Sequence, residues 1–143
     1  MGSRHRAREW ALQLLFENDF NPNSPDEALP QFWTLRDPAP TGKEFTESLY
    51  LGVLEHKDDI DRLLEQYADN WGLKRMSAVD RNIMRVAIFE MLHRADIPPV
   101  VTINEAVELA KAFGGSDSGG FVNGILDRAR KDIDRPARTA AEE

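Results

Sequence analysis

The sequence predicts an all-α protein of about seven helices, and three observations support this fold class. Apolar side chains recur along most of the chain at the three- and four-residue spacing of helices. Turn-forming clusters of proline, glycine and asparagine divide it into segments of helix length. No stretch alternates apolar and polar residues as a strand does, and no repeat period is found. With 143 residues, 41% of them hydrophobic, the chain is long enough for one buried core.

The first expected helix occupies the N-terminal segment, where apolar side chains follow the spacing of an amphipathic helix. These side chains are Ala7, Trp10, Ala11, Leu14 and Leu15. A turn over residues 21–25 ends this helix, and Ser24 with Glu27 predicts a capping box around Pro25, which suits the first helical position. A short second helix follows. Pro30 makes the residue at which it starts uncertain.

A proline-rich break precedes the third expected helix, which spans residues 43–56. Thr41 and Glu44 stand at the positions of its capping box. A fourth helix begins at Asp58 and Asp59, because negative charges suit a helix N-terminus. The apolar stripes of these two helices are Phe45, Leu49, Gly52 and Val53, then Ile60, Leu63, Leu64 and Tyr67.

The fifth expected helix follows Ser77, a natural N-cap, and is apolar on more than one side. We therefore expect it at the centre of the core. A sixth helix starts after the proline pair at 98 and 99 and ends at Phe113, which the helical register assigns to the core. Gly114 follows as a candidate left-handed C-cap.

The glycine-rich segment 114–120 is similar to a phosphate-binding loop only in composition. It lacks the Gly-Lys-Ser/Thr ending and follows a helix, whereas a phosphate loop follows a strand. We interpret it as an interhelical turn that opens the last helix. This seventh helix is expected from Phe121 to about Lys131, and residues 136–143 are expected to form a flexible polar tail.

Composition and motifs argue against catalysis. The chain has no cysteine, which excludes a disulfide framework, a cysteine-containing zinc site and a thiol nucleophile. Its three histidines, His5, His56 and His93, are far apart and form no metal-ligating motif, so we expect no metal and no cofactor. No nucleophile elbow and no acid–base pair is recognised. No apolar run is long enough for a membrane span or a signal peptide, so we expect a cytoplasmic protein.

The net charge of −7 is unevenly distributed. Residues 17–71 carry a net charge of −9, and the rest of the chain carries +2. Three arginines precede the first acidic residue, and a second basic segment covers 128–138. Basic ends around an acidic middle suit a protein that holds a polyanion on one face and another partner elsewhere. A solvated surface with charges clustered by chance is the alternative.

Distinctive motifs occur in five segments. Residues 4–16 begin with an arginine-rich run and continue as an amphipathic stripe. The others are 76–85 (M-S-A-V-D-R-N-I-M-R), 103–111 (I-N-E-A-V-E-L-A-K) and 121–127 (F-V-N-G-I-L-D), with D-I-P-P at 96–99. In this order and spacing the motifs resemble the NusB family of transcription antitermination factors over residues 4–131.

The resemblance implies a single domain over residues 1–135, with helices one to three and four to seven as two packed bundles. It also implies a non-catalytic bacterial adaptor. NusB-like proteins bind the boxA element of ribosomal RNA leader transcripts, a single-stranded RNA, together with NusE, a small ribosomal subunit protein. With other Nus factors they help RNA polymerase resist termination.

The resemblance and the side-chain chemistry together predict the RNA contacts. Arginines pair with phosphates, Phe121 is expected to stack on a base, and Asp117 and Ser118 are candidates for base-edge hydrogen bonds. A core position for Phe121 is the alternative. The predicted RNA-binding residues are Arg4, His5, Arg6, Arg8, Gln13, Asp117, Ser118 and Phe121.

By the same resemblance, Phe16, Asp80 and Glu90 are expected to contact NusE. Asp80 lies early in the fifth helix and could equally serve the helix dipole. The alternative to an RNA-binding adaptor is a protein-binding helical scaffold or homodimer without RNA binding. The arginine-rich start favours the adaptor, because a scaffold has no need of it.

Overall fold

The computed structural model describes residues 2–36, 41–69 and 72–133, which contain helices and no strand. The α-helices are α1 (Gly2–Phe20), α2 (Pro25–Thr34), α3 (Lys43–Glu55), α4 (Lys57–Tyr67), α5 (Ala78–His93), α6 (Pro99–Phe113) and α7 (Ser118–Asp132). A short 3-10 helix, η1 (Leu73–Arg75), precedes α5. The predicted all-α class and the number of α-helices are confirmed.

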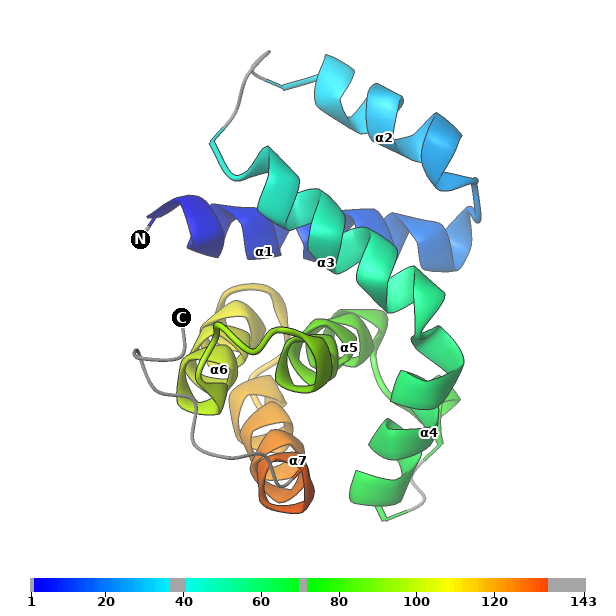
Figure 1. The fold of residues 1–143 in the computed structure, drawn as a ribbon. Coiled ribbons are helices and arrows are strands. Elements are labelled where there is room, and N and C mark those ends of the chain that lie inside the picture. Colours follow the sequence, from blue (N-terminus) through cyan, green and yellow to red (C-terminus); the bar gives the residue numbers. More distant parts are fainter. Residues whose placement is uncertain (1, 37–40, 70–71, 134–143) are drawn as a thin grey trace.

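Helix α5 forms the centre of the molecule. Figure 1 shows α1, α2 and α3 on one side of it and α4, α6 and α7 around its other sides. It packs against α1, α3, α4, α6 and α7, and eleven of its sixteen residues are buried, so its predicted central place is confirmed. One continuous cluster of buried apolar side chains joins all seven α-helices. The division into two bundles stays a prediction, and the expected tail at 136–143 lies outside the described residues.

Three predicted N-caps can be compared with the helix starts. The Ser77 cap is confirmed, because its Oγ accepts a hydrogen bond from the Asp80 backbone N–H at 3.0 Å. The Ser24 capping box is wrong, since this side chain makes no capping bond. The Thr41 capping box is also wrong, because α3 is preceded by Gly42 in the left-handed region at φ 96°, a conformation that glycine adopts without strain.

The end of α6 differs from the prediction in two ways. Phe113 is 51% exposed, not buried, because it lies in the last turn, beyond the stretch of α6 that faces the core. Gly114 is extended at φ −95° and ψ −171°, so the predicted left-handed cap is wrong. Helix α7 begins at Ser118, three residues before the expected Phe121, since hydrogen bonds to the Ser118 side chain fix the first turn there.

A polar network ties the end of α1 to α4 and α5. Arg85 donates from Nε and Nη2 to both carboxylate oxygens of Asp61, at 2.8 and 2.9 Å, and from Nη1 to Asp19 at 3.3 Å. Asp19 also accepts hydrogen bonds from Arg81 and Asn82. These charge-assisted bonds fix how the C-terminal half of α1 lies on α5.

Candidate nucleic-acid interface

The three arginines at the start of α1 differ sharply in exposure. The side chains of Arg6 and Arg4 are 61% and 47% exposed, whereas that of Arg8 is 5% exposed. A helix turns 100° per residue, so Arg8 shares the buried face with Ala11 and Leu15, three and seven positions later. Only two of the three predicted phosphate-binding arginines therefore reach solvent.

Arg8 and Glu90 form an ion pair inside the protein. Arg8 Nε donates to Glu90 Oε2 at 2.7 Å, and Arg8 Nη2 donates to Oε1 at 3.0 Å. Thr102 on α6 donates to the same Oε1 at 2.7 Å. Glu90 is 1% exposed, so neither the predicted RNA contact Arg8 nor the predicted NusE contact Glu90 lies at the surface. Their geometry joins α1, α5 and α6.

Arg4 is held at the edge of the interface by two neighbours. Its guanidinium carbon lies 4.5 Å from the Phe45 ring centroid, and its Nη2 donates to Asp96 at 3.2 Å. Arg94 donates to both carboxylate oxygens of Asp96, and these bonds, with a smaller contribution from Arg4, lower the pKa of Asp96 to about 2. Arg4 is therefore held in place but stays partly open to a ligand.

His5 links α1 to α6. Its Nδ1 lies 2.9 Å from a carboxylate oxygen of Glu105, and its Nε2 lies 3.2 Å from Glu9. The hydrogen bond to Glu105 raises the pKa of His5 above its ordinary value, with the charges of both glutamates adding to this effect. Protonated His5 adds a third positive charge beside Arg4 and Arg6.

The raised pKa of His5 predicts a pH-dependent contribution to stability. Because folding raises this pKa, the contribution is fully present below the unfolded pKa of about 6.5 and is lost as pH rises through the folded pKa. We expect His5→Gln to lower the melting temperature more at pH 5.5 than at pH 8.5, relative to wild type. Thermal unfolding of both proteins at the two pH values measures this, and an equal difference at both would contradict it.

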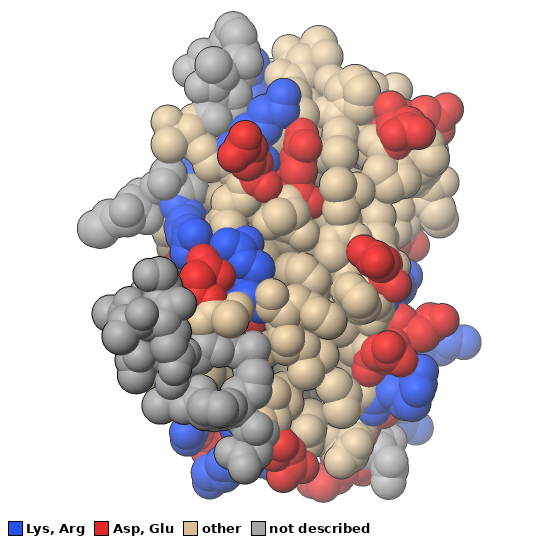
Figure 2. Space-filling view, in the orientation of Figure 1, with Lys and Arg blue, Asp and Glu red and all other residues tan. Residues whose placement is uncertain are grey.

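A hollow of about 470 Å³ runs along the outer face of α1, and we call it the α1 groove. It is lined by Arg6, Glu9, Trp10, Leu12, Gln13, Phe16, Val79 and Phe113. The structure thus brings together three predicted site residues, Arg6, Gln13 and Phe16. Figure 2 shows basic and acidic side chains intermixed near the N-terminal end of α1. The groove therefore offers aromatic surface beside one arginine and one glutamate, and its lining is not a basic patch.

Sequence reasoning missed five residues of the α1 groove: Glu9, Trp10, Leu12, Val79 and Phe113. Trp10 and Phe113 fall in apolar helical stripes, so the pattern assigned them to the core. The size of these two side chains could have indicated partial exposure, because large aromatic side chains are seldom completely buried. Both are available at the groove for stacking on a flat ligand.

The turn before α7 is fastened to the start of α5. Ser118 Oγ donates to Asp80 at 3.0 Å and accepts from the Gly115 N–H at 2.9 Å. Ser118 and Asp80 are both buried, so the predicted base-edge contact and the predicted NusE contact lie below the surface. Asp117 is exposed, and Phe121 is half-buried against the core. Asp80 and Ser118 position this turn.

The described part of the chain contains neither a metal-binding cluster nor a membrane-spanning helix. Among these residues, no group of three or more histidine, aspartate or glutamate side chains could hold a metal ion. Their helices are also too short or too polar to cross a lipid bilayer.

Comparison with known proteins identifies the fold and the family. The sequence matches the NusB family over residues 5–131. It is 44% identical over 140 residues to the transcription antitermination protein NusB of Myxococcus xanthus, covering 95% of this chain and 100% of that protein. The structure resembles T. maritima NusB with a TM-score of 0.80 at 38% identity, covering 90% of this chain and 91% of that one.

A second solved structure shares the architecture at lower identity. In a complex of the antitermination factors NusB and NusE with double-stranded RNA, the matching chain is 24% identical, with a TM-score of 0.81 over 92% of this chain and 98% of that one. At this identity the likeness concerns the fold. The family match over most of the chain and the close sequence relative together show that this protein belongs to the NusB family.

Proposed function

We propose that this protein is a non-catalytic RNA-binding adaptor of transcription antitermination in the bacterial cytoplasm. It binds the boxA element of ribosomal RNA leader transcripts together with NusE, and with other Nus factors it supports processive RNA polymerase. Membership of the NusB family is the observation that carries this proposal. A solved complex of a NusB with NusE and RNA on the same fold supports the choice of partners.

The exposed residues at the N-terminal half of α1 support an RNA-binding face. Arg4, His5 and Arg6 supply charge for phosphates, and the α1 groove supplies Gln13 for a base edge and aromatic rings for stacking. Asp117 remains a proposed base-edge contact because it is exposed. Phe121 remains a proposed stacking residue. A purely structural role in the core stays the alternative, since Phe121 packs against the core cluster.

The buried members of the predicted site take another role in this proposal. Arg8, Glu90, Asp80 and Ser118 hold α1, α5, α6 and the turn before α7 in place and so position the exposed residues. Phe16, which is half-buried in the α1 groove, remains the proposed direct contact to NusE.

The proposal is tested by titrating the protein with a boxA-like single-stranded RNA and with a scrambled RNA of equal length, each with and without NusE. We expect tighter binding of the boxA-like RNA and a further gain when NusE is present. Equal affinity for both RNAs in the presence of NusE would contradict the adaptor function. Self-association without RNA binding would support the scaffold or homodimer.

A further inference from the structure

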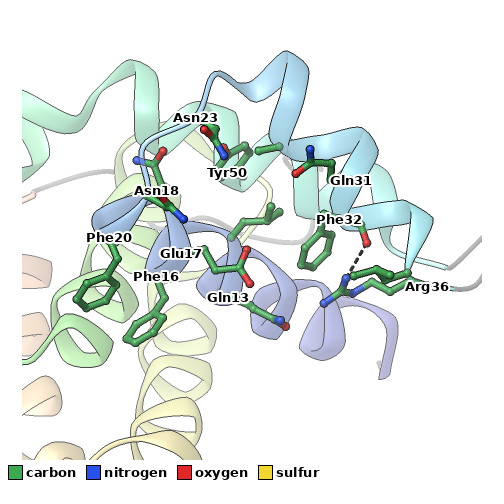
Figure 3. A pocket seen from close by; sticks show the side chains of 14 residues that line it. Gln13, Phe16, Glu17, Asn18, Phe20, Asn23, Gln31, Phe32, Arg36 and Tyr50 are labelled. Atoms are coloured by element: carbon green, nitrogen blue, oxygen red, sulfur yellow. Dashed lines mark hydrogen bonds between the residues drawn. The ribbon is translucent and has the colours of Figure 1, made fainter.

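A second hollow, the α2 cleft, lies between the C-terminal half of α1 and helix α2 and has a volume of about 470 Å³ (Figure 3). Gln13 and Phe16 line both this cleft and the α1 groove, so the two hollows adjoin across α1. Five amide side chains surround the α2 cleft: Gln13, Asn18, Asn21, Asn23 and Gln31. Each amide offers a hydrogen-bond donor and an acceptor.

Tyr50 of α3 lines the α2 cleft with an unsatisfied hydroxyl group. Its side chain is completely buried, and its hydroxyl has no hydrogen-bond partner among the described residues. Burial, with the nearby Glu17 carboxylate, raises the pKa of Tyr50, so the hydroxyl keeps its proton and can donate. Buried polar groups nearly always have a partner. Tyr50 is one of the residues that line the cleft, so a ligand bound in the cleft can supply that partner.

The α2 cleft also contains flat surfaces for stacking. The guanidinium carbon of Arg36 lies 3.4 Å from the ring centroid of Phe32, and Arg36 Nη1 donates to the Phe32 carbonyl at 2.6 Å. This fixes the plane of the guanidinium in the wall of the cleft. Phe16 packs on Phe20 with ring centroids 5.0 Å apart, and Phe20 is 68% exposed at the rim.

The lining indicates the chemical class of the ligand. Glu17 and Arg36 carry opposite charges, so the cleft favours neither anions nor cations. Amides pair with edges that carry adjacent donors and acceptors, and guanidinium and phenyl faces stack on flat rings. A neutral, flat heterocycle with donors and acceptors along its edge satisfies all of these groups.

We infer that the α2 cleft binds one unstacked nucleobase, whose edge hydrogen-bonds to the Tyr50 hydroxyl. The inference rests on the proposed function for the source of the base, an RNA strand lying in the adjoining α1 groove. A free nucleoside has the same chemistry and is the other source. The shared position of Gln13 and Phe16 favours the strand, because it lets one base turn from the groove into the cleft.

Tyr50→Phe tests the inference, since it removes the hydroxyl and keeps the ring. We expect it to weaken binding of the boxA-like RNA about 2- to 10-fold, the effect of losing one hydrogen bond. We expect its melting temperature to be equal to or higher than that of wild type, because the lost hydroxyl has no partner in the free protein. The matched control is Tyr67→Phe, which removes the hydroxyl of another buried tyrosine, beside the Asp132 carboxylate. It should lower the melting temperature and leave RNA affinity unchanged.

A 2-aminopurine substitution, moved along the same RNA, locates the base. We expect one position whose fluorescence rises on binding to wild type, and we expect this rise to be reduced with Tyr50→Phe. Tight RNA binding with no such position and no effect of Tyr50→Phe would overturn the cleft as a base pocket and leave the proposed function standing.

Adenosine as a free probe separates the two sources. In one outcome, adenosine shifts the NMR signals of cleft residues in wild type but not in Tyr50→Phe, while the protein does not bind the RNA even with NusE. This result would support the nucleobase pocket and overturn the proposed function. No response to either adenosine or the RNA would overturn both.

Discussion

Replacing Arg8 by alanine is expected to destabilise the protein by about 3–5 kcal/mol, because it leaves the buried Glu90 carboxylate without its charged partner. Glu90 is 1% exposed, so water does not replace the lost guanidinium. Among the described residues, the Thr102 hydroxyl is then the hydrogen-bond partner that remains to this carboxylate. Urea unfolding of wild type and Arg8→Ala measures the free energy of unfolding directly.

Two further variants test whether the loss of stability comes from the buried Arg8–Glu90 pair. Arg6→Ala removes an exposed arginine two positions earlier and should change stability by less than about 0.5 kcal/mol. The double variant Arg8→Met with Glu90→Leu replaces both charges by apolar groups and should recover much of the loss. Equal small effects of Arg8→Ala and Arg6→Ala would show that Arg8 is not buried in solution.

Gly52→Ala is expected to destabilise the protein by about 1–3 kcal/mol, because α3 and α5 approach too closely for another side chain. A Cβ at this position would overlap the ring of Phe89. That ring packs at a tilt against His93, with 5.2 Å between centroids, and His93 in turn stacks on His56 at 4.1 Å. Thermal or urea unfolding gives the size of the loss.

Gly124→Ala provides the matched control for this substitution. Gly124 also lies inside a helix, but among the described residues no atom beyond its chain neighbours and its own helix backbone stands within 4 Å of an added Cβ. Alanine should therefore stabilise α7 by up to about 1 kcal/mol. Adding Phe89→Leu to Gly52→Ala should restore part of the lost stability, since it makes room for the new methyl group. A stabilising effect of Gly52→Ala alone would contradict the close packing.

The order and type of the helices were predictable because each depends on nearby residues. The apolar spacing in 78–92 identifies the central helix, and the proline pair at 98 and 99 marks the start of α6. Helix ends were less predictable. The Thr41 cap failed because the chain instead uses the left-handed conformation of Gly42, and a capping motif gives no information on which of two adjacent residues adopts the cap geometry.

The candidate site was predictable only in part, because its buried pairs join distant parts of the chain. Arg8 and Glu90 are separated by 82 residues, and no local pattern indicates that they meet. One signal was available: Arg8 falls on the buried stripe of α1 with Ala11 and Leu15. The Asp80–Ser118 bond spans 38 residues and is equally hidden from local patterns.

The central claim is that the exposed arginines of α1 contact RNA phosphates, and the salt dependence of RNA affinity tests it most directly. Each phosphate contact with single-stranded RNA contributes about −0.7 to the slope of log affinity against log salt. We expect the double variant Arg4→Ala with Arg6→Ala to flatten the wild-type slope by about 1.4. Arg62→Ala, which removes an exposed arginine on α4, should leave the slope unchanged. An unchanged slope in the double variant would contradict the claim and place the RNA on another face.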